Sequence, residues 1–299
     1  MVAYQSQRQR EIGNIDMKIQ IDKIFDNKSI NKYDLNLNIG SNQMLINVSK
    51  TKSNTHIAIL EKVFDNDLNQ IEFPLTNFIK ALKESPIKIS KQYAKVSISI
   101  SNGLFSVVPK ALFQEKNIDL YIKQNAQIKY SYDYRHQVLE KEGLVICYAI
   151  PPKLNTWIKK VFPKAKVTHE IAVLSESALR DFYSLSEDRV VINIHKSYFY
   201  IASLKKGKLE FVNKFPFSEK EDLLYYILFT FEQLGINPDL IEVFLTGEIQ
   251  KGSEEHQLLF QYIKNLHFGF RNKNIKISGA LNDIPKHYFY TIFNQSLCV

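Results

Sequence analysis

The sequence predicts an α/β protein that consists of two related halves around a cleft. Residues 188–246 show the pattern most clearly, because they read as three short strands, a long helix and a buried strand. Residues 35–50 repeat the opening of this stretch in a weaker form, and a third strand, a helix and a further strand follow them. Both halves therefore share the order β-β-β-α-β, which indicates a duplicated fold.

The helix of the second half has the clearest boundaries. Ser218, followed three residues later by Glu221, matches the capping-box pattern, in which each side chain bonds to the other residue's free backbone N–H. Apolar residues then recur at helical spacing, Gly235 ends the helix, and Pro238 prevents its continuation. The strands around it, each an apolar run or an alternating pattern, are predicted at residues 190–194, 199–204, 209–215 and 240–245.

The first half matches the second at four aligned positions. Asn38, Ile39, Ile46 and Lys50 fall on Asn193, Ile194, Ile201 and Lys205. The dipeptide Asn102-Gly103 predicts a two-residue hairpin turn between strands at 96–101 and 104–108. Further strands are predicted at 55–63, 144–150 and 164–167, and further helices at 74–85, from Pro151-Pro152 onward and at 170–184.

The remaining segments complete the two halves. Residues 130–136 alternate aromatic and polar side chains, which predicts an edge strand or a connecting loop, with a stacking platform for bases as the alternative. Ser253 begins a helix, residues 275–278 form a last strand, and a terminal helix follows Pro285. No linker rich in Gly, Ser or Pro separates the halves, so we expect two closely packed lobes at residues 1–184, which include an N-terminal extension, and 185–299.

Composition narrows the class of protein. Apolar residues make up 45% of the 299 residues, with 10 glycines and 9 prolines, which is typical of a folded globule. No apolar run approaches the ~20 residues needed to span a bilayer, and the first ten residues lack the apolar core of a secretory signal. Cys147 and Cys298 stand in apolar contexts without metal-binding spacing. They predict buried thiols, a reducing cytoplasmic location and no metal site.

The charge raises the question of nucleic-acid binding, because the formal net charge is +8 and the pI is about 9.1. The lysines, however, occur in ones and twos along the whole chain. Such a distribution favours solvated faces over a basic groove, so we expect nucleic-acid binding to be the less favoured interpretation.

Over nearly its whole length the chain resembles the actin-like ATPase (ribonuclease H-like) architecture, in which two β-β-β-α-β-α-β-α lobes surround a cleft. The resemblance depends on the combined order of LNLNIGSNQMLINV, FSVVPKALF, VICYAIPPKLNTWIKKVFPKAKVTHEIAVL, KGKLEFVNKFPFSEKEDLLYYILFTFEQLGI and EVFLTGEI. Within that superfamily the chain is similar to the bacterial division protein FtsA and to the cytoplasmic actin-like domains of pilus and type II secretion assembly. It is most similar to an uncharacterised bacterial family, domain of unknown function 3822.

The resemblance also implies where a nucleotide would bind. In active members of the superfamily both inter-strand turns follow an Asp-x-Gly pattern, in which the aspartates hold Mg²⁺ and water and the glycine and hydroxyl groups hold the phosphates. A later Gly-Gly turn packs on adenosine. The corresponding residues here are Asn38, Gly40, Ser41 and Asn42 in the first turn, Asn193, His195, Lys196 and Ser197 in the second, and Thr246 and Gly247 in the adenosine turn.

The substitutions in this set predict a degenerate nucleotide cleft with no metal site and no catalytic residue. Asn38 and Asn193 are neutral and offer one carbonyl oxygen each, so a hard divalent cation loses both charge and ligands. Phosphoryl transfer depends chiefly on charge compensation and positioning. The side chain of His195 would also crowd a phosphate that normally approaches bare backbone. ATP and Mg²⁺ are therefore disfavoured, although Lys196, if it is not simply a solvated turn lysine, could meet a phosphate directly.

These observations predict a non-catalytic actin-like scaffold or adaptor that binds another protein. The first alternative is a nucleotide-binding protein or weak ATPase that uses Lys196 and Ser41 without the usual carboxylates. Nucleic-acid binding through the basic surface is a further alternative. A ribonuclease-H-like nuclease is disfavoured, because its two-metal chemistry needs clustered carboxylates where these strands carry asparagine.

Overall fold

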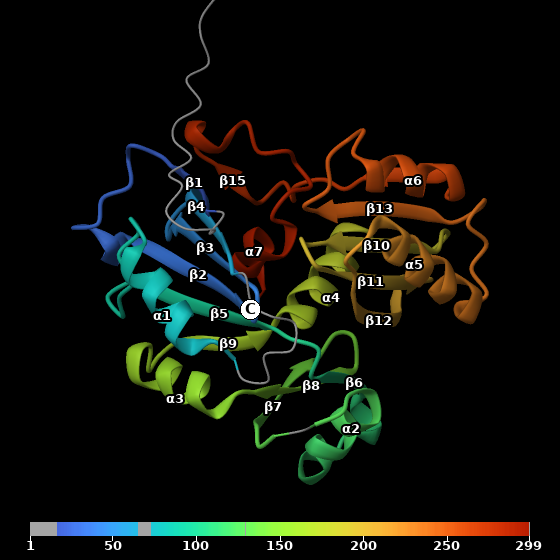
Figure 1. Ribbon diagram of the computed structural model, residues 1–299, viewed down its shortest axis with the longest axis horizontal. Coiled ribbons are helices and arrows are strands. Elements are labelled where there is room, and N and C mark those ends of the chain that lie inside the picture. The colour runs from blue at the N-terminus through green and yellow to red at the C-terminus, as the bar shows by residue number, and fades with distance from the viewer. Residues whose placement is uncertain (1–16, 65–72, 129, 299) are drawn as a thin grey trace, which may run out of the picture.

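Two large β-sheets with helices around them form the body of the molecule (Figure 1). The computed structural model describes residues 17–64, 73–128 and 130–298, so the first ten residues, on which the expectation about a secretory signal rests, lie outside the described part. Within these ranges no helix combines the length and the apolar character that crossing a bilayer requires.

The first sheet follows the order β1-β4-β3-β2-β5-β9, and β15 also pairs with β4. Strands β2, β3 and β4 are antiparallel neighbours, whereas β5 and β9 continue the sheet from β2 in parallel. The strands are β1 (Met17–Ile21), β2 (Tyr33–Gly40), β3 (Gln43–Lys50), β4 (Thr55–Val63), β5 (Lys95–Ser101), β9 (Lys166–His169) and β15 (Lys276–Ile277).

The second sheet repeats this plan in the order β12-β11-β10-β13-β14. Its first three strands are antiparallel, and β13 and β14 extend the sheet from β10 in parallel. Because the strands of both sheets are connected and ordered alike, the predicted duplication is confirmed. The strands are β10 (Arg189–Ile194), β11 (Tyr198–Lys205), β12 (Lys208–Pro216), β13 (Glu242–Gly247) and β14 (Asn265–Phe268).

Helices cover the sheets because each buries one apolar side. The second-lobe helix α5 buries Leu223, Ile227 and Phe231 in a core shared with β10, β11 and β13. Short 3-10 helices lie at Ile30–Lys32, Lys110–Leu112, Glu115–Asn117, Gly279–Leu281 and Gln295–Leu297. The α-helices are α1 (Leu75–Glu84), α2 (Ile118–Asn125), α3 (Pro152–Val161), α4 (Glu170–Asp181), α5 (Lys220–Leu234), α6 (Glu254–Tyr262) and α7 (Tyr290–Asn294).

The hairpin predicted at Asn102-Gly103 is wrong, because the strand after this turn belongs to a third, smaller sheet. Strand β6 (Phe105–Pro109) pairs with β8 (Leu144–Ile150), which also pairs with β7 (Asp133–Leu139), and none of the three pairs with β5. The side chain of Asn102 explains the redirection, since it accepts a hydrogen bond from Leu104 N at 2.8 Å and donates one to Ala149 O at 2.8 Å. The amide therefore turns the chain into the new sheet, whose edge strand β7 contains part of the aromatic segment at 130–136.

The end of the chain returns to the first lobe, although the sequence placed residues 185–299 in the second. Strand β15 runs parallel to β4. Ile275, Ile292 and Phe293 form one apolar cluster with Leu45 and Ile59 of the first sheet. This segment packs there because the first sheet otherwise leaves apolar side chains of β3 and β4 uncovered on that face.

Helix α5 starts one residue later than the capping pattern indicated. Its N-cap is Glu219, which forms the capping box with Asp222 in place of Ser218 and Glu221. The carboxylates of Glu219 and Asp222 accept the hydrogen bonds of free backbone N–H groups, as the predicted pair would, and their negative charge also lies at the positive end of the helix dipole. The predicted end is confirmed, because Gly235 adopts the left-handed conformation with φ 66°.

Candidate functional site

The structure brings the two predicted turns together between the lobes. The first turn joins β2 to β3, and the second joins β10 to β11. The Asn42 side-chain amide donates a hydrogen bond to Ser197 Oγ, which connects one turn to the other. Ser41 and Lys196, at the tips of the turns, are both exposed.

Asn38 and Asn193 occupy equivalent places, each bonded to a hydroxyl on the parallel strand next to its own. Asn38 Nδ2 donates to Ser99 Oγ at 2.9 Å, and Thr246 Oγ1 donates to Asn193 Oδ1 at 3.0 Å. All four side chains are buried. An amide can both donate and accept, so it suits a buried contact between strands, whereas an aspartate there would also need its charge compensated.

His195, at the position where the resemblance implies glycine, is buried among side chains of both lobes. Its ring stacks on Tyr198 with centroids 4.4 Å apart and an interplanar angle of 20°. Its Nε2 lies 2.8 Å from Asn193 Nδ2 and 3.4 Å from Glu170 Oε1, and its Nδ1 lies 3.8 Å from Glu248 Oε1. The imidazole thus fills a volume that a glycine at this position would leave empty.

Glu170, which sequence reasoning missed, is the centre of this buried polar cluster. It begins α4, accepts hydrogen bonds from Tyr200 OH at 3.0 Å and Thr291 Oγ1 at 2.7 Å, and lies 3.4 Å from the hydroxyl of Tyr198. Burial acts to raise its pKa, but attraction to His195 and the donated hydrogen bonds hold the pKa well below its usual range. The carboxylate therefore ties α4, β11 and α7 together.

A half-buried lysine also reaches the space between the lobes. Lys214 on β12 donates to Ser101 O at 3.3 Å, and its Nζ lies 3.6 Å from the Tyr198 ring centroid. Burial lowers the pKa of Lys214 to about 8, and the charge of Glu170 opposes this effect. The sequence did contain one indication of this position. Lys214 lies two residues after Val212, so both side chains are on the side of β12 that packs against the largest apolar cluster of the molecule.

A second bridge joins the lobes through one amide and two carboxyl groups. Gln43 Nε2 donates to Glu61 Oε1 at 2.8 Å within the first lobe and to Glu248 Oε1 at 2.6 Å in the second. Burial raises the pKa of Glu248 well above its ordinary value, and the nearby Glu61 raises it further. Two buried carboxyl groups on one donor favour a protonated Glu248, which removes the repulsion between them.

The retained glycines fit the fold without a ligand. A Cβ at Gly40 would lie 3.2 Å from Gln43 O, and a Cβ at Gly247 would lie 2.1 Å from Ile194 O. Gly247 also adopts a φ of 83°. Close packing of backbone therefore accounts for glycine at both positions.

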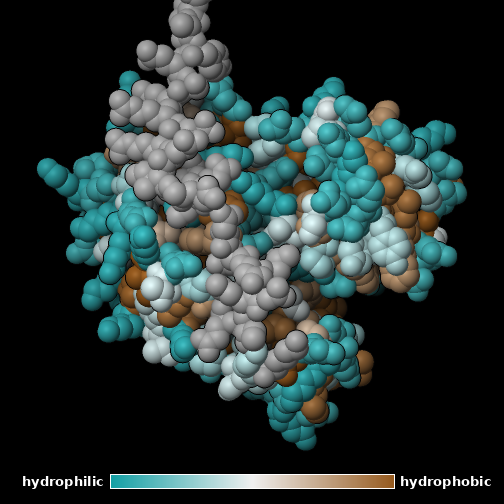
Figure 2. Space-filling model, in the orientation of Figure 1, coloured by the Kyte–Doolittle hydropathy of each residue, from teal (hydrophilic) through white to brown (hydrophobic). Residues whose placement is uncertain are grey.

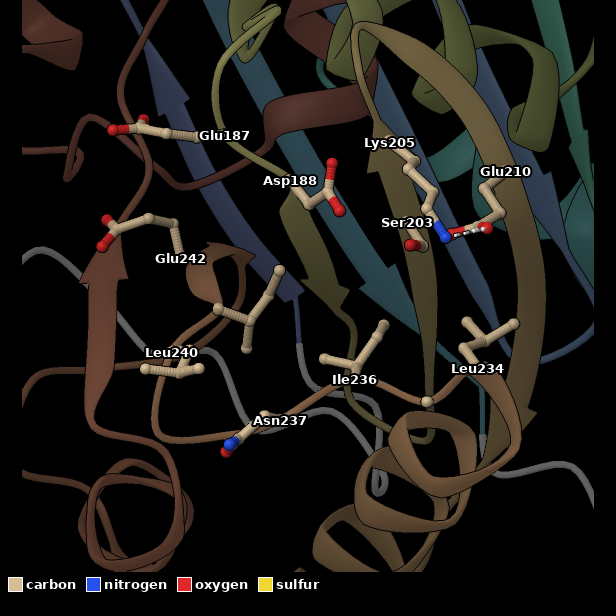
Figure 3. Close-up of a pocket in the computed structure, with 12 residues that line it drawn as sticks. Glu187, Asp188, Ser203, Lys205, Glu210, Leu234, Ile236, Asn237, Leu240 and Glu242 are labelled. Atoms are coloured by element: carbon tan, nitrogen blue, oxygen red, sulfur yellow. Dashed lines mark hydrogen bonds and ion pairs between the residues drawn. The ribbon is translucent and has the colours of Figure 1, made fainter.

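One cavity lies beside the first turn, and a larger one lies at the end of the second sheet away from the turns. Beside Ser41 lies a cavity of about 140 Å³, lined by first-lobe residues that include Ile100, Asn102 and Tyr132. This volume is below the roughly 300–1,000 Å³ of typical ligand pockets. A cavity of about 420 Å³ lies at the other end of the second sheet, where its lining includes Asp188 and Lys205 and the amine of Lys205 points to Glu210 (Figure 3).

The side chains between the lobes do not fit a magnesium–nucleotide complex. The turns that would hold the phosphates bond to each other, and both positions that would carry aspartate hold amides engaged with neighbouring strands. Among the described residues, no three His, Cys, Asp or Glu side chains gather in a way that could hold a metal ion.

Comparison with known proteins agrees with this architecture. A family described as protein of unknown function (DUF3822) matches residues 22–266. A Bacteroides thetaiotaomicron protein with an actin-like ATPase fold and unknown function superposes with a TM-score of 0.72 at 21% identity, over 82% of this chain and 93% of that one. A chain of the PilM–PilN type IV pilus biogenesis complex superposes with a TM-score of 0.57 at 13% identity, over 88% and 97% respectively. No curated protein matches the sequence. The chain therefore belongs to the DUF3822 family and has the actin-like ATPase fold.

Proposed function

We propose that this protein is a non-catalytic actin-like scaffold or adaptor that binds another protein. The observation that carries the proposal is the hydrogen bond from Asn42 to Ser197, which joins the two turns between which phosphates would have to enter. The contact from Gln43 to Glu248 reinforces it, because this second hydrogen bond also connects the lobes directly. Both contacts hold the lobes together at the turns where the resemblance would place a nucleotide.

The charges in this region also support the proposal. Phosphoryl transfer requires metal ions or cations placed around the transferring group. Here Asn38 and Asn193 carry no charge, and Lys214 is engaged with Tyr198 and Ser101. The polar groups between the lobes are thus committed to one another, as in a packed interface between rigid parts.

The protein partner is supported by the similarity in fold to a chain of the PilM–PilN complex, in which a protein of this architecture assembles with another protein. The same role suits the present chain, because a closed space between the lobes leaves the outer surfaces as the places where function can reside. A chain purified from its host should then elute with one partner at fixed stoichiometry.

Thermal unfolding with and without millimolar Mg-ATP or Mg-ADP tests the non-catalytic part of the proposal. We expect no change in Tm. A ligand present at a hundred times its Kd would add about 2.7 kcal/mol of stability, which corresponds to a shift of about 5 °C or more. A shift of that size would show that nucleotide binds and would overturn the proposal.

A double-mutant cycle tests the closed contact itself. Asn42→Ala and Ser197→Ala should each destabilise the protein, and their effects should be coupled by about 0.5–1 kcal/mol because they share one hydrogen bond. The control pair is Ser184 and Ser186, whose exposed hydroxyls lie 3.3 Å apart within one loop and should show no measurable coupling. Additive effects of Asn42→Ala and Ser197→Ala would mean that the turns do not touch in solution.

A further inference from the structure

The positive charge of the chain is concentrated in two segments that the fold brings together. Residues 75–95 and 152–166 contain ten lysines and one acidic residue, Glu84. Their net charge of +9 slightly exceeds the +8 of the whole chain, so all other residues together are close to neutral. The even spread of lysines along the sequence therefore conceals two lysine-rich segments of the first lobe that pack against each other.

Helices α1 and α3, which these segments contain, enclose an apolar groove between them. Phe78 of α1 packs edge-on against Trp157 of α3 with centroids 5.3 Å apart. Beside this contact lies a cavity of about 450 Å³ whose lining is mostly apolar, with Asn27, Ser85, Lys83 and Lys88 as its polar members and no carboxylate. Figure 2 shows brown, hydrophobic surface between these helices with teal, hydrophilic surface beside it.

Hydrogen bonds fix one wall of this groove. Asn27 Nδ2 donates to Pro86 O at 2.9 Å, and Asn27 Oδ1 accepts from Lys88 N at 2.8 Å. Tyr93 OH donates to Lys88 O at 2.9 Å. The turn after α1 is therefore held in place before any partner arrives, which reduces the entropy cost of binding.

The lining argues against a membrane or a nucleic acid as the occupant. None of the large exposed hydrophobic side chains of the described residues lies in 75–95 or 152–166, so no apolar group protrudes to enter a bilayer. The two segments contain no arginine, and Trp157 is only partly exposed, with its edges against Phe78 and Phe162. A recessed apolar floor with a lysine rim instead fits a side chain that is inserted from a protein carrying carboxylates.

We propose that the α1–α3 groove binds an acidic segment of another protein, which inserts a bulky apolar side chain beside Trp157 and places carboxylates on Lys83 and Lys88. The inference rests on the proposed adaptor function, because it names where the partner binds and with what chemistry. Its test is independent of nucleotide binding, so each of the two can fail without the other.

The experiment uses Trp157, which is the only tryptophan in the chain. The probe is a fluorescein-labelled helical peptide with one phenylalanine and one leucine on the same face and glutamate at the flanking positions. We expect saturable binding by anisotropy, weakened by added salt, together with a change in Trp157 emission in a parallel titration with the unlabelled peptide. A peptide with the same charge but alanine in place of both apolar residues, and one with glutamine in place of glutamate, should each bind at least about tenfold more weakly.

Charge reversal identifies the binding face. Lys83→Glu combined with Lys88→Glu should weaken binding of the acidic peptide at least about tenfold, since exposed ion pairs of this kind contribute modestly and two would be inverted. The matched control is Lys251→Glu combined with Lys264→Glu, two exposed lysines of the second lobe, which should leave the affinity within about twofold. All four positions are exposed, so both variants should fold.

Three results would overturn the proposal. One is equal loss of affinity in the variant and its control, which would indicate charge attraction spread over the whole surface. Another is unchanged Trp157 emission at saturation, which would place the peptide elsewhere. The third is binding of phosphatidylglycerol vesicles or duplex DNA under conditions in which the peptide does not bind.

Discussion

Replacing Glu170 with alanine removes the acceptor on which three parts of the fold converge. The carboxylate begins α4, accepts hydrogen bonds from Tyr200 on β11 at 3.0 Å and from Thr291 on α7 at 2.7 Å, and lies 3.4 Å from His195 Nε2. All of these side chains are buried. The substitution therefore leaves two hydroxyl groups and the imidazole without their main partner in a region that water does not reach.

The size of the effect follows from those contacts. Each buried donor that loses its acceptor costs about 1–3 kcal/mol, and removing one member of a buried charged group costs about 3–5 kcal/mol. We expect Glu170→Ala to lower the free energy of unfolding by about 4 kcal/mol. Glu170→Gln should cost less, about 2 kcal/mol, because its carbonyl oxygen still accepts one hydrogen bond.

Urea unfolding followed by far-UV circular dichroism measures this change, with the dependence on urea concentration required to be equal in all variants. Glu254→Ala is the matched control, because Glu254 is an exposed glutamate near a helix start that pairs with Lys220 at 2.7 Å, and its loss should not shift the midpoint measurably. A loss below about 1 kcal/mol for Glu170→Ala would contradict the buried cluster and, with it, the packed state of the space between the lobes.

Three further predictions concern single positions and pH. Gly247→Ala should destabilise the protein by at least about 2 kcal/mol more than Gly252→Ala in urea unfolding, because both glycines have φ 83° but only at Gly247 would the new Cβ meet backbone, 2.1 Å from Ile194 O; equal losses would refute the close approach. His56 and His169 are buried, and burial lowers the pKa of each to about 3. Their folded pKa values lie below the unfolded value of about 6.5, so their contribution to stability is present above that pH. It should be lost by about 1.4 kcal/mol per histidine per pH unit as the pH falls from 6.5 toward 3; stability that stays flat between pH 7 and about 5 would exclude this. Ser253→Ala should cost about 1 kcal/mol in thermal unfolding, because Ser253 Oγ accepts the hydrogen bond of a free backbone N–H at the start of α6; an unchanged Tm would show that the cap contributes nothing.

The duplicated strands could be predicted because their signal is local. Alternating or continuous apolar runs identify β2, β3, β10 and β11 regardless of what packs on them, and Gly235 ends α5 in the left-handed conformation wherever that helix lies. The hairpin at Asn102-Gly103 was wrong for a non-local reason. The side-chain amide of Asn102 donates a hydrogen bond to Ala149 O on β8, and the dipeptide sequence alone cannot indicate a partner so far along the chain.

Some residues of the candidate site could likewise be predicted from the sequence, and others could not. The turns at Asn38 to Asn42 and Asn193 to Ser197 follow from the repeat, and the structure places them opposite each other. Glu170 carried no local signal of its position between the lobes, and for Lys214 the alternation with Val212 indicated a side of β12 but not the groups that it meets there. Their surroundings come from strands and helices far apart in the chain. Those surroundings lower the pKa of Glu170 through His195 and donated hydrogen bonds, against the effect of burial, and lower the pKa of Lys214 through burial.

By itself, the sequence determined a doubled strand order, since periodicity is a property of each segment alone, and it put asparagine at positions 38 and 193, where the resemblance to actin-like ATPases implies aspartate. Only the tertiary structure decided that the turns bond to each other, that the last residues pack on the first sheet, and that two lysine-rich segments meet at one groove lined by Lys83 and Lys88. The physical reason is that hydrogen bonds, burial and charge density depend on distances in space, and residues such as Asn42 and Ser197, 155 positions apart, meet only after the chain has folded.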